Sequence, residues 1–195
     1  MIVFLSTAGT IGIILAIVAV VIIAYVISVY NKLVQLRNRV RNGWSQIDVQ
    51  LKRRFDLIPN LVETVKGYAT HEKEIWDQFG KARGMYQQAA KSGDVGQAAE
   101  AEKGLTGALA RLMVVQEAYP ELKANENFKE MMAQLKDTED KISFNRQFYN
   151  DTAMAFNNKI EVFPANIVAK MFKFIAAKFF EVEEAAERQG VKVKF

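Results

Sequence analysis

The sequence predicts an all-α protein in which an N-terminal transmembrane helix runs into an antiparallel bundle of long helices with coiled-coil character. Three observations predict this class. Residues 11–29 form an apolar stretch without a charged side chain. Only three prolines interrupt the 195 residues, and residues that favour helices are abundant. Beyond the apolar stretch, hydrophobic residues recur at steps of three and four, the spacing of one helix face.

The stretch 11–29 is expected to span a bilayer. As a helix it rises about 1.5 Å per residue and matches a hydrocarbon core of about 30 Å. A buried core helix, the alternative, normally has a polar face, and this stretch has none. A cleaved signal peptide carries basic residues before a shorter apolar run, whereas here Lys32 is the first charged residue. We therefore predict an uncleaved anchor over residues 1–31.

Basic residues follow the anchor directly. Between residues 32 and 54 there are several lysines and arginines but a single acid, Asp48. Such a flank favours the cytoplasmic side, so we predict the N-terminus outside and the main domain in the cytoplasm; alternatively, these residues only solvate a helix face. The net charge of +4 argues against a nucleic-acid partner and fits attraction to membrane lipids.

The helical pattern continues from residue 30 to residue 65, and Pro59 lies within it. A proline removes one backbone donor, so we expect a kink or a brief break at residues 56–59. A turn follows at residues 91–94, where Asp94 resembles the first residue of a capping box. The next helix is expected to end at Tyr119-Pro120.

A long helix is predicted over residues 126–162, since large apolar residues fall seven apart from Phe128 through Tyr149 to Phe163. Glu139 and Arg146 occupy the companion position of this seam. A charge facing a seam usually has a partner on another helix, and Arg53, Arg54 and Asp48 are the candidates. The network is either catalytic or sensing, or it is a structural network that sets helix register, and the structural alternative is favoured.

Phe163-Pro164 is expected to break this helix. Residues 165–180 combine aromatic side chains, including Phe172 and Phe179, with lysines. We predict a helix that either lies in the membrane interface or closes the bundle core. Residues 181–195 are acidic at first and are expected to form a flexible tail, which leaves residues 32–180 as the bundle.

The inventory for catalysis is poor. The chain has one histidine, His71, and no cysteine. His71 begins a sequence that lacks the second histidine of the HExxH zinc motif, and no glycine-rich phosphate loop is present. We predict no catalytic residue, no cofactor and no metal site.

Several segments resemble the bacterial LemA family. They comprise residues 30–34, 43–54 with Trp44, 56–62 with Pro59, and 119–124, followed by Glu139, Arg146, Tyr149 and Phe163-Pro164. One departure is Gly43, where relatives often carry alanine. The resemblance implies an N-terminal anchor and an all-helical bundle at the bacterial cytoplasmic (inner) membrane, with relatives in magnetosome membranes. It implies no catalytic residues.

Three functions remain open. The first is a scaffold that self-associates into a homo-oligomer, because Gly12 and Ala16 have the spacing that lets helices approach closely in membranes. The second is an adaptor or regulator of another membrane protein, such as a protease or a sensor. The third, least favoured, is an enzyme with a buried site of Glu139, Arg146, Asp48 and Arg53.

Overall fold

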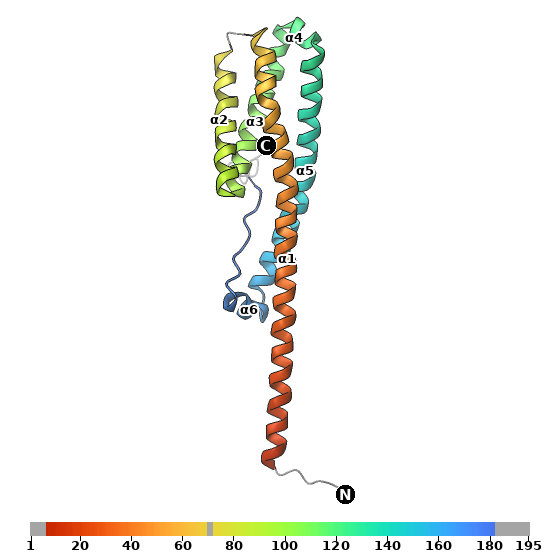
Figure 1. Cartoon of the computed structure of the whole chain (residues 1–195), viewed down its shortest axis with the longest axis vertical. Coiled ribbons are helices and arrows are strands. Elements are labelled where there is room, and N and C mark those ends of the chain that lie inside the picture. The colour runs from red at the N-terminus through yellow and green to blue at the C-terminus, as the bar shows by residue number, and fades with distance from the viewer. Residues whose placement is uncertain (1–6, 70–71, 182–195) are drawn as a thin grey trace, which may run out of the picture. The chain divides into compact units, whose positions relative to one another are not determined.

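The computed structural model describes residues 7–69 and 72–181, and within these residues every regular element is a helix (Figure 1). They are α1 (Thr7–Lys66), α2 (Lys73–Ser92), α3 (Val95–Val115), a 3-10 turn η1 (Gln116–Ala118), α4 (Pro120–Ala124), α5 (Glu126–Glu161) and α6 (Ala165–Met171). The predicted all-α class is confirmed. The chain divides into two compact units, Met1–Arg41 with Thr152–Ala177 and Asn42–Asp151 with Lys178–Phe195. His71 lies outside the described residues.

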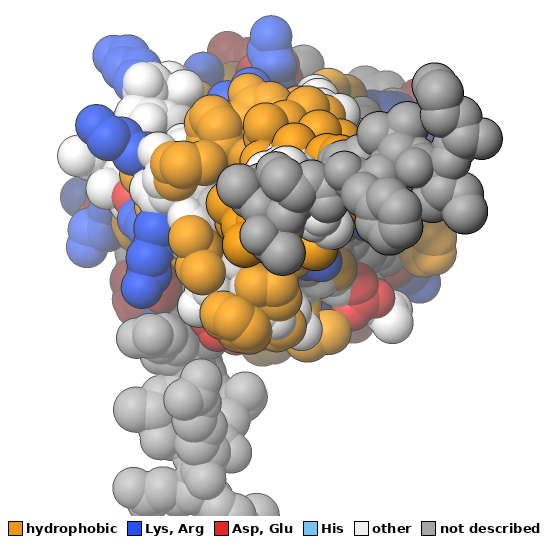
Figure 2. Space-filling model, turned by 90° about the horizontal axis from the view of Figure 1, so that it is seen from below, with side chains coloured by type: hydrophobic (Ala, Val, Ile, Leu, Met, Phe, Trp, Pro, Cys, Tyr) orange, Lys and Arg blue, Asp and Glu red, His pale blue; other side chains and the backbone are white. Residues whose placement is uncertain are grey.

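The first unit contains the apolar part of α1. In the described part of the chain, α1 is the one helix long and apolar enough to cross a membrane. Its apolar side chains are exposed, among them Ile11, Ile13, Leu15, Val18, Ile22 and Ile27. Figure 2, which looks toward the end where α1 begins, shows predominantly hydrophobic side chains among the described residues nearest the viewer. An exposed apolar helix of this length is suited to lipid.

The first unit also holds residues 152–161 of α5, a cis Phe163-Pro164 bond and α6. The helix predicted over residues 165–180 is wrong, because α6 ends at Met171. Lys173 has a left-handed φ of 54°, which a helix does not continue through. Beyond it, the Asn157 amide binds the backbone of Ala177: Ala177 N donates to Oδ1 at 2.8 Å, and Nδ2 donates to Ala177 O at 3.0 Å.

Aromatic packing holds this non-helical segment to its unit. The Phe172 ring lies 4.7 Å from the ring of Tyr30, and the Phe174 ring lies 6.3 Å from that of Phe156. The Arg37 guanidinium sits 5.2 Å above the Phe174 ring, a cation–π distance. The aromatic residues that we expected on a helix therefore serve as anchors for an extended segment.

The second unit is a bundle made by α2, α3, α4 and parts of α1 and α5. Consecutive long helices alternate in direction within it (Figure 1). Its core includes Ile47, Leu51, Phe55, Phe79, Leu105, Leu112, Phe128, Leu135 and Ile142. Within α1, the break expected at residues 56–59 does not occur, since the helix passes through Pro59. Ile58 before the proline and Leu61 after it are both buried, and this burial offsets the lost backbone bond.

The link between α2 and α3 follows the predicted turn chemistry. Gly93 has φ 67°, and the Asp94 side chain accepts hydrogen bonds from the backbone N–H of Gly96 and Gln97. These two contacts satisfy donors at the start of α3 that have no partner inside the helix. The cap predicted at Asp94 is confirmed. Lys178 Nζ also donates to Asp94 Oδ2 at 2.9 Å.

Replacing a glycine by alanine should have opposite effects on stability at Gly43 and at Gly93. At Gly43, inside α1, a Cβ would lie 3.4 Å from Tyr149 Cα, an ordinary van der Waals distance. Gly43→Ala should therefore stabilise the chain by about 1 kcal/mol through helix propensity. Gly93→Ala should destabilise it by about 1–2 kcal/mol, because an alanine is strained at a left-handed φ.

Urea unfolding of the full chain in mild detergent, followed by far-UV circular dichroism, measures both effects. Equal destabilisation by the two substitutions would show that the close approach of α1 to α5 at Gly43 excludes a side chain.

Candidate functional site

The second unit buries a charge. Arg54 lies three residues after Leu51 and four before Ile58, so it shares the core-facing stripe of α1. Its side chain has 0% exposure. A guanidinium without water requires counter-charges and hydrogen-bond acceptors from the protein. The elements that supply them define the candidate site.

Two helices supply the partners of Arg54. From α3, Glu102 forms an ion pair with Arg54 Nη1, and Thr106 Oγ1 accepts a hydrogen bond from the same nitrogen at 3.3 Å. From α5, Glu139 Oε2 lies 3.3 Å from Arg54 Nη2. Of the three candidate partners that the sequence offered for the seam charges, Arg54 is the one that pairs with Glu139. We refer to Arg54, Glu102, Thr106 and Glu139 as the ion cluster.

The two carboxylates of the ion cluster differ in exposure. The Glu102 side chain is 12% exposed, whereas that of Glu139 is 49% exposed. Burial lowers the pKa of Arg54, and the negative charge of Glu139 opposes this shift. Arg54 Nε and Glu102 Oε2 have no hydrogen-bond partner within the described structure. Water or a small polar molecule could satisfy these two atoms.

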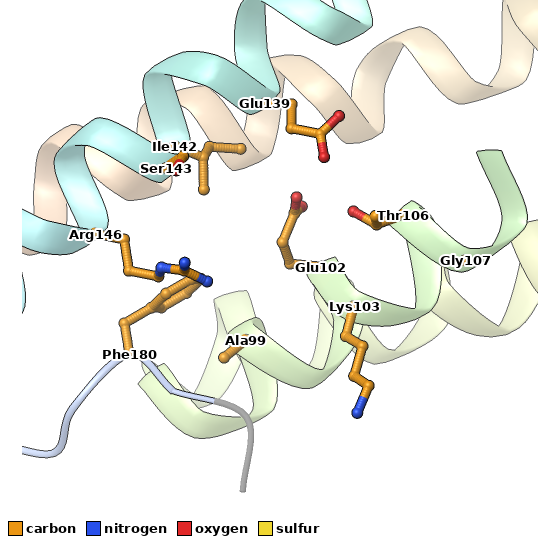
Figure 3. A pocket seen from close by; sticks show the side chains of 10 residues that line it. All are labelled: Ala99, Glu102, Lys103, Thr106, Gly107, Glu139, Ile142, Ser143, Arg146 and Phe180. Atoms are coloured by element: carbon orange, nitrogen blue, oxygen red, sulfur yellow. The ribbon is translucent and has the colours of Figure 1, made fainter. Parts of the chain in front are cut away.

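A groove runs between α3 and α5, and the residues of the ion cluster form part of its lining. Its first hollow, of about 490 Å³, is lined by Ala99, Glu102, Lys103, Thr106, Gly107, Glu139, Ile142, Ser143, Arg146 and Phe180. In Figure 3 the carboxylates of Glu102 and Glu139 point toward each other, and Arg146 reaches toward Phe180. Arg146 forms no ion pair with any residue that the structure describes.

The second hollow, of about 510 Å³, continues along the same two helices. It is lined by Arg54, Thr106, Leu109, Ala110, Met113, Met132, Ala133, Leu135, Lys136, Glu139 and Asp140. Thr106 and Glu139 line both hollows. The second hollow is largely apolar and includes two methionines, side chains that adapt to varied partners. We call the two hollows together the α3/α5 groove.

Other predicted residues lie away from the ion cluster. Trp44 packs against the rings of Tyr149 and Phe180, at 6.1 and 6.0 Å. The Tyr149 hydroxyl donates to Lys178 O at 2.7 Å, and burial raises the pKa of this tyrosine. Asn150 Oδ1 accepts a hydrogen bond from Phe180 N at 2.9 Å, and Asn150 Nδ2 donates to Phe180 O at 3.3 Å. Together these contacts fix the end of the described chain.

Asp48 and Arg53 do not join the ion cluster. Asp48 lies beside Tyr86, whose pKa is raised to about 12 by burial first and then by the charges of Asp48 and Asp56. The Arg53 side chain is half-exposed, and its Nη1 lies 3.8 Å from Asp137 Oδ2. The four residues of the least favoured alternative, Glu139, Arg146, Asp48 and Arg53, therefore do not form one buried cluster.

The remaining predicted residues are exposed. They are Gly12 and Ala16 on the apolar part of α1, Phe163 and Pro164 before α6, Phe172, and Phe179; Pro59, within α1, is half-buried. A Cβ at Gly12 would meet nothing within 4 Å, so this surface is open to a neighbouring helix or to lipid.

Sequence reasoning missed Glu102, Asn150 and Asn157. Glu102 had a detectable signal, because it lies four residues after Ala98 and three before Leu105 on the buried stripe of α3. The asparagines are seven residues apart on α5, and only their contacts with the distant C-terminal segment reveal their role.

Breaking the buried ion pair of Arg54 with Glu102 should lower the free energy of unfolding far more than breaking the half-exposed pair of Arg54 with Glu139. Glu102→Gln leaves a buried guanidinium short of a counter-charge and should destabilise the chain by about 3 kcal/mol. Glu139→Gln should cost less than about 1 kcal/mol, because water screens this half-exposed carboxylate. Replacing both Arg54→Met and Glu102→Leu should restore most of the loss. Urea unfolding in detergent measures all three, and equal losses for the two Glu→Gln variants would refute the buried-pair assignment.

Comparison with known proteins identifies relatives of this chain. The LemA family model matches residues 43–195. Magnetosome protein MamQ 2 of Paramagnetospirillum magneticum is 29% identical over 191 residues, which cover 86% of this chain and 70% of the relative. Magnetosome protein MamQ of Magnetospirillum gryphiswaldense is 26% identical, with 92% and 75% covered. Protein LemA of Metamycoplasma hominis is 26% identical, with 79% and 69% covered. Since the family match extends over most of its length, the chain belongs to the LemA family.

Proposed function

We propose that the protein is a non-enzymatic, membrane-anchored helical scaffold that self-associates into a homo-oligomer at the bacterial cytoplasmic membrane. The exposed apolar part of α1 supports the anchor. The basic residues between positions 32 and 54 support a bundle on the cytoplasmic side. The α6 segment adds exposed Phe163, Ile167 and Met171 beside Lys170, a combination suited to lipid headgroups and acyl chains.

One observation carries self-association: an exposed aromatic patch in the second unit. Phe144 is 74% exposed and Phe148 is 47% exposed, and their spacing of four places them on the same side of α5. Val49 of α1, 59% exposed, lines a shallow hollow with Asn145 of α5. We call Val49, Phe144 and Phe148 the aromatic patch.

The surroundings of the aromatic patch resemble the rim of a protein interface. Ser45, Gln46 and Gln50 line the same hollow as Val49, so uncharged polar groups border the apolar side chains. Aromatic residues surrounded by polar groups are typical of surfaces that bind protein. A second copy of the chain is the proposed occupant.

The α3/α5 groove favours a second candidate function, an adaptor for another membrane protein, because it offers an elongated and largely apolar surface. An enzymatic role receives less support. The residues that line the two hollows include no histidine or cysteine, and both carboxylates of the ion cluster share one guanidinium.

Light scattering of the full chain in detergent tests self-association. The wild-type mass should be a multiple of 22.0 kDa, and Phe144→Ser with Phe148→Ser should weaken assembly at least tenfold. Val114→Ser is the control, because Val114 is as exposed as Phe144 but lies on α3. A wild-type monomer at every concentration would contradict the scaffold. A monomer that crosslinks to a different membrane protein in cells would favour the adaptor.

Reporter fusions test the topology. A reporter active only in the cytoplasm should be active when fused after residue 195, since the basic flank of the span retains this side. Replacing Lys32, Arg37, Arg39 and Arg41 by glutamine should reduce this preference. Activity of a periplasmic reporter at the same position in the unaltered chain would contradict the orientation.

A further inference from the structure

The apolar part of α1 determines where the surface of a bilayer would cross this helix. Residues 11–29 contain no charged side chain. As a helix they rise about 28 Å, close to the thickness of a hydrocarbon core of about 30 Å. Tyr30 follows this stretch directly, and Lys32 is the first charged residue; both residue types are typical of the headgroup region. When α1 spans a bilayer, the boundary between acyl chains and headgroups therefore lies at Tyr30, whichever side of the membrane the bundle occupies.

Residues 162–175, which we call the α6 segment, are packed against α1 at this height. The rings of Phe172 and Phe174 lie 4.7 and 5.9 Å from the ring of Tyr30. The Arg37 guanidinium, two turns further along α1, lies 5.2 Å from the centre of the Phe174 ring. All of these residues belong to the first unit. The α6 segment is therefore held beside the place where α1 leaves the bilayer.

The α6 segment presents a hydrophobic surface to its surroundings. Phe163, Ile167 and Met171 follow one another at steps of four and are 74%, 59% and 58% exposed. Ile175 is 83% exposed, whereas Val168 on the inner side of α6 is buried. The exposed side of a helix in water is normally polar. A cluster of exposed apolar side chains marks a contact with a membrane or with another protein.

The charges of the first unit favour a membrane as the occupant. Lys170 and Lys173 are exposed among the apolar side chains of the α6 segment, and residues 162–177 contain no acid. Residues 30–41 of α1 contain four bases and no acid. Apolar side chains interleaved with lysines suit a lipid surface, because the apolar groups enter the acyl region while the ammonium groups reach the headgroups. An excess of positive charge favours anionic lipids.

We propose that the α6 segment is a second membrane-binding element. It inserts its exposed apolar side chains into the leaflet from which α1 emerges, and Lys170 and Lys173 bind anionic headgroups there. The proposal rests on the membrane anchor of the proposed function and does not depend on self-association. Two points of attachment hinder rotation of α1 about its own axis, so that one side of the first unit stays turned toward the lipid.

Quenching of a fluorescent label by lipid tests the proposal, and the chain contains no cysteine of its own. Ile167→Cys and Ile175→Cys each carry an environment-sensitive dye in the full chain. The vesicles contain phosphatidylcholine and phosphatidylglycerol with brominated acyl chains. Both labels should be quenched at least threefold more strongly than one at Met154→Cys. Met154 is the matched control: it is 51% exposed in the same unit, but it lies seven residues before the end of α5, about 10 Å along that helix.

The lipid class has its own readout. Omitting phosphatidylglycerol should reduce quenching at Ile175→Cys at least twofold, and Lys170→Gln with Lys173→Gln should do the same in vesicles that contain it. Neither change should alter quenching at Val18→Cys, which lies in the apolar part of α1 and is 48% exposed. Unchanged quenching at Ile175→Cys under both conditions would overturn the assignment of anionic lipid.

The label at Val18→Cys also separates this proposal from the anchor on which it rests. Strong quenching there, with Ile167→Cys and Ile175→Cys no more quenched than Met154→Cys, would overturn the proposal and leave the anchor in place. An unquenched label at Val18→Cys would contradict the anchor itself. Crosslinks between copies through Ile167→Cys, in place of quenching, would also overturn the proposal, because a second copy would then cover this surface. Circular dichroism of each variant establishes that the helices are intact.

Discussion

A single buried guanidinium constrains the second unit. The Arg54 side chain has 0% exposure to solvent, so α3 must present Glu102 and Thr106 to it, and α5 must present Glu139. Removing a partner from such a cluster leaves a charge in an apolar environment, which costs several times more than a surface ion pair contributes. Sliding either helix by one turn, about 5.4 Å, would separate the charges. The ion cluster therefore specifies the register of three helices that apolar contacts alone would leave less defined.

Asparagine side chains impose a second constraint, once in each unit. The segment after α6 has neither a helix nor a neighbouring strand to satisfy its backbone. Asn157 provides a donor and an acceptor to Ala177, and Asn150 does the same for Phe180. An amide is the side chain that can both donate and accept in this way. Because these bonds hold the backbone, the aromatic side chains of the segment are available for packing, as Phe174 and Phe180 show.

The fold was predictable from the sequence wherever the decisive interactions are local. Asp94 caps its own helix, and Phe128, Leu135 and Ile142 mark the buried side of α5 by their spacing. The end of α6 was not predictable, because its composition suits a helix while the bonds that compete with helix formation come from Asn157. A partner for Glu139 on another helix was expected because a charge lies on an apolar seam, but the sequence left Arg53, Arg54 and Asp48 open, and the structure selects Arg54. The role of Glu102 was not predicted, because the leucines of α3 were sufficient to define its buried face and the acid on the same face was not considered.

The ion cluster also shapes the surface that is left over. Glu139 and Thr106 line both hollows of the α3/α5 groove, so polar atoms lie between two stretches of apolar lining. An uninterrupted apolar groove would accept many hydrophobic segments. Both hollows carry acids and bases, namely Glu102, Glu139, Asp140, Arg54, Lys103, Lys136 and Arg146. Such a groove disfavours a segment that leaves these charges unmatched, since an unmatched charge would lose its water without compensation. The interaction that sets helix register thus also places charged groups along the groove between α3 and α5.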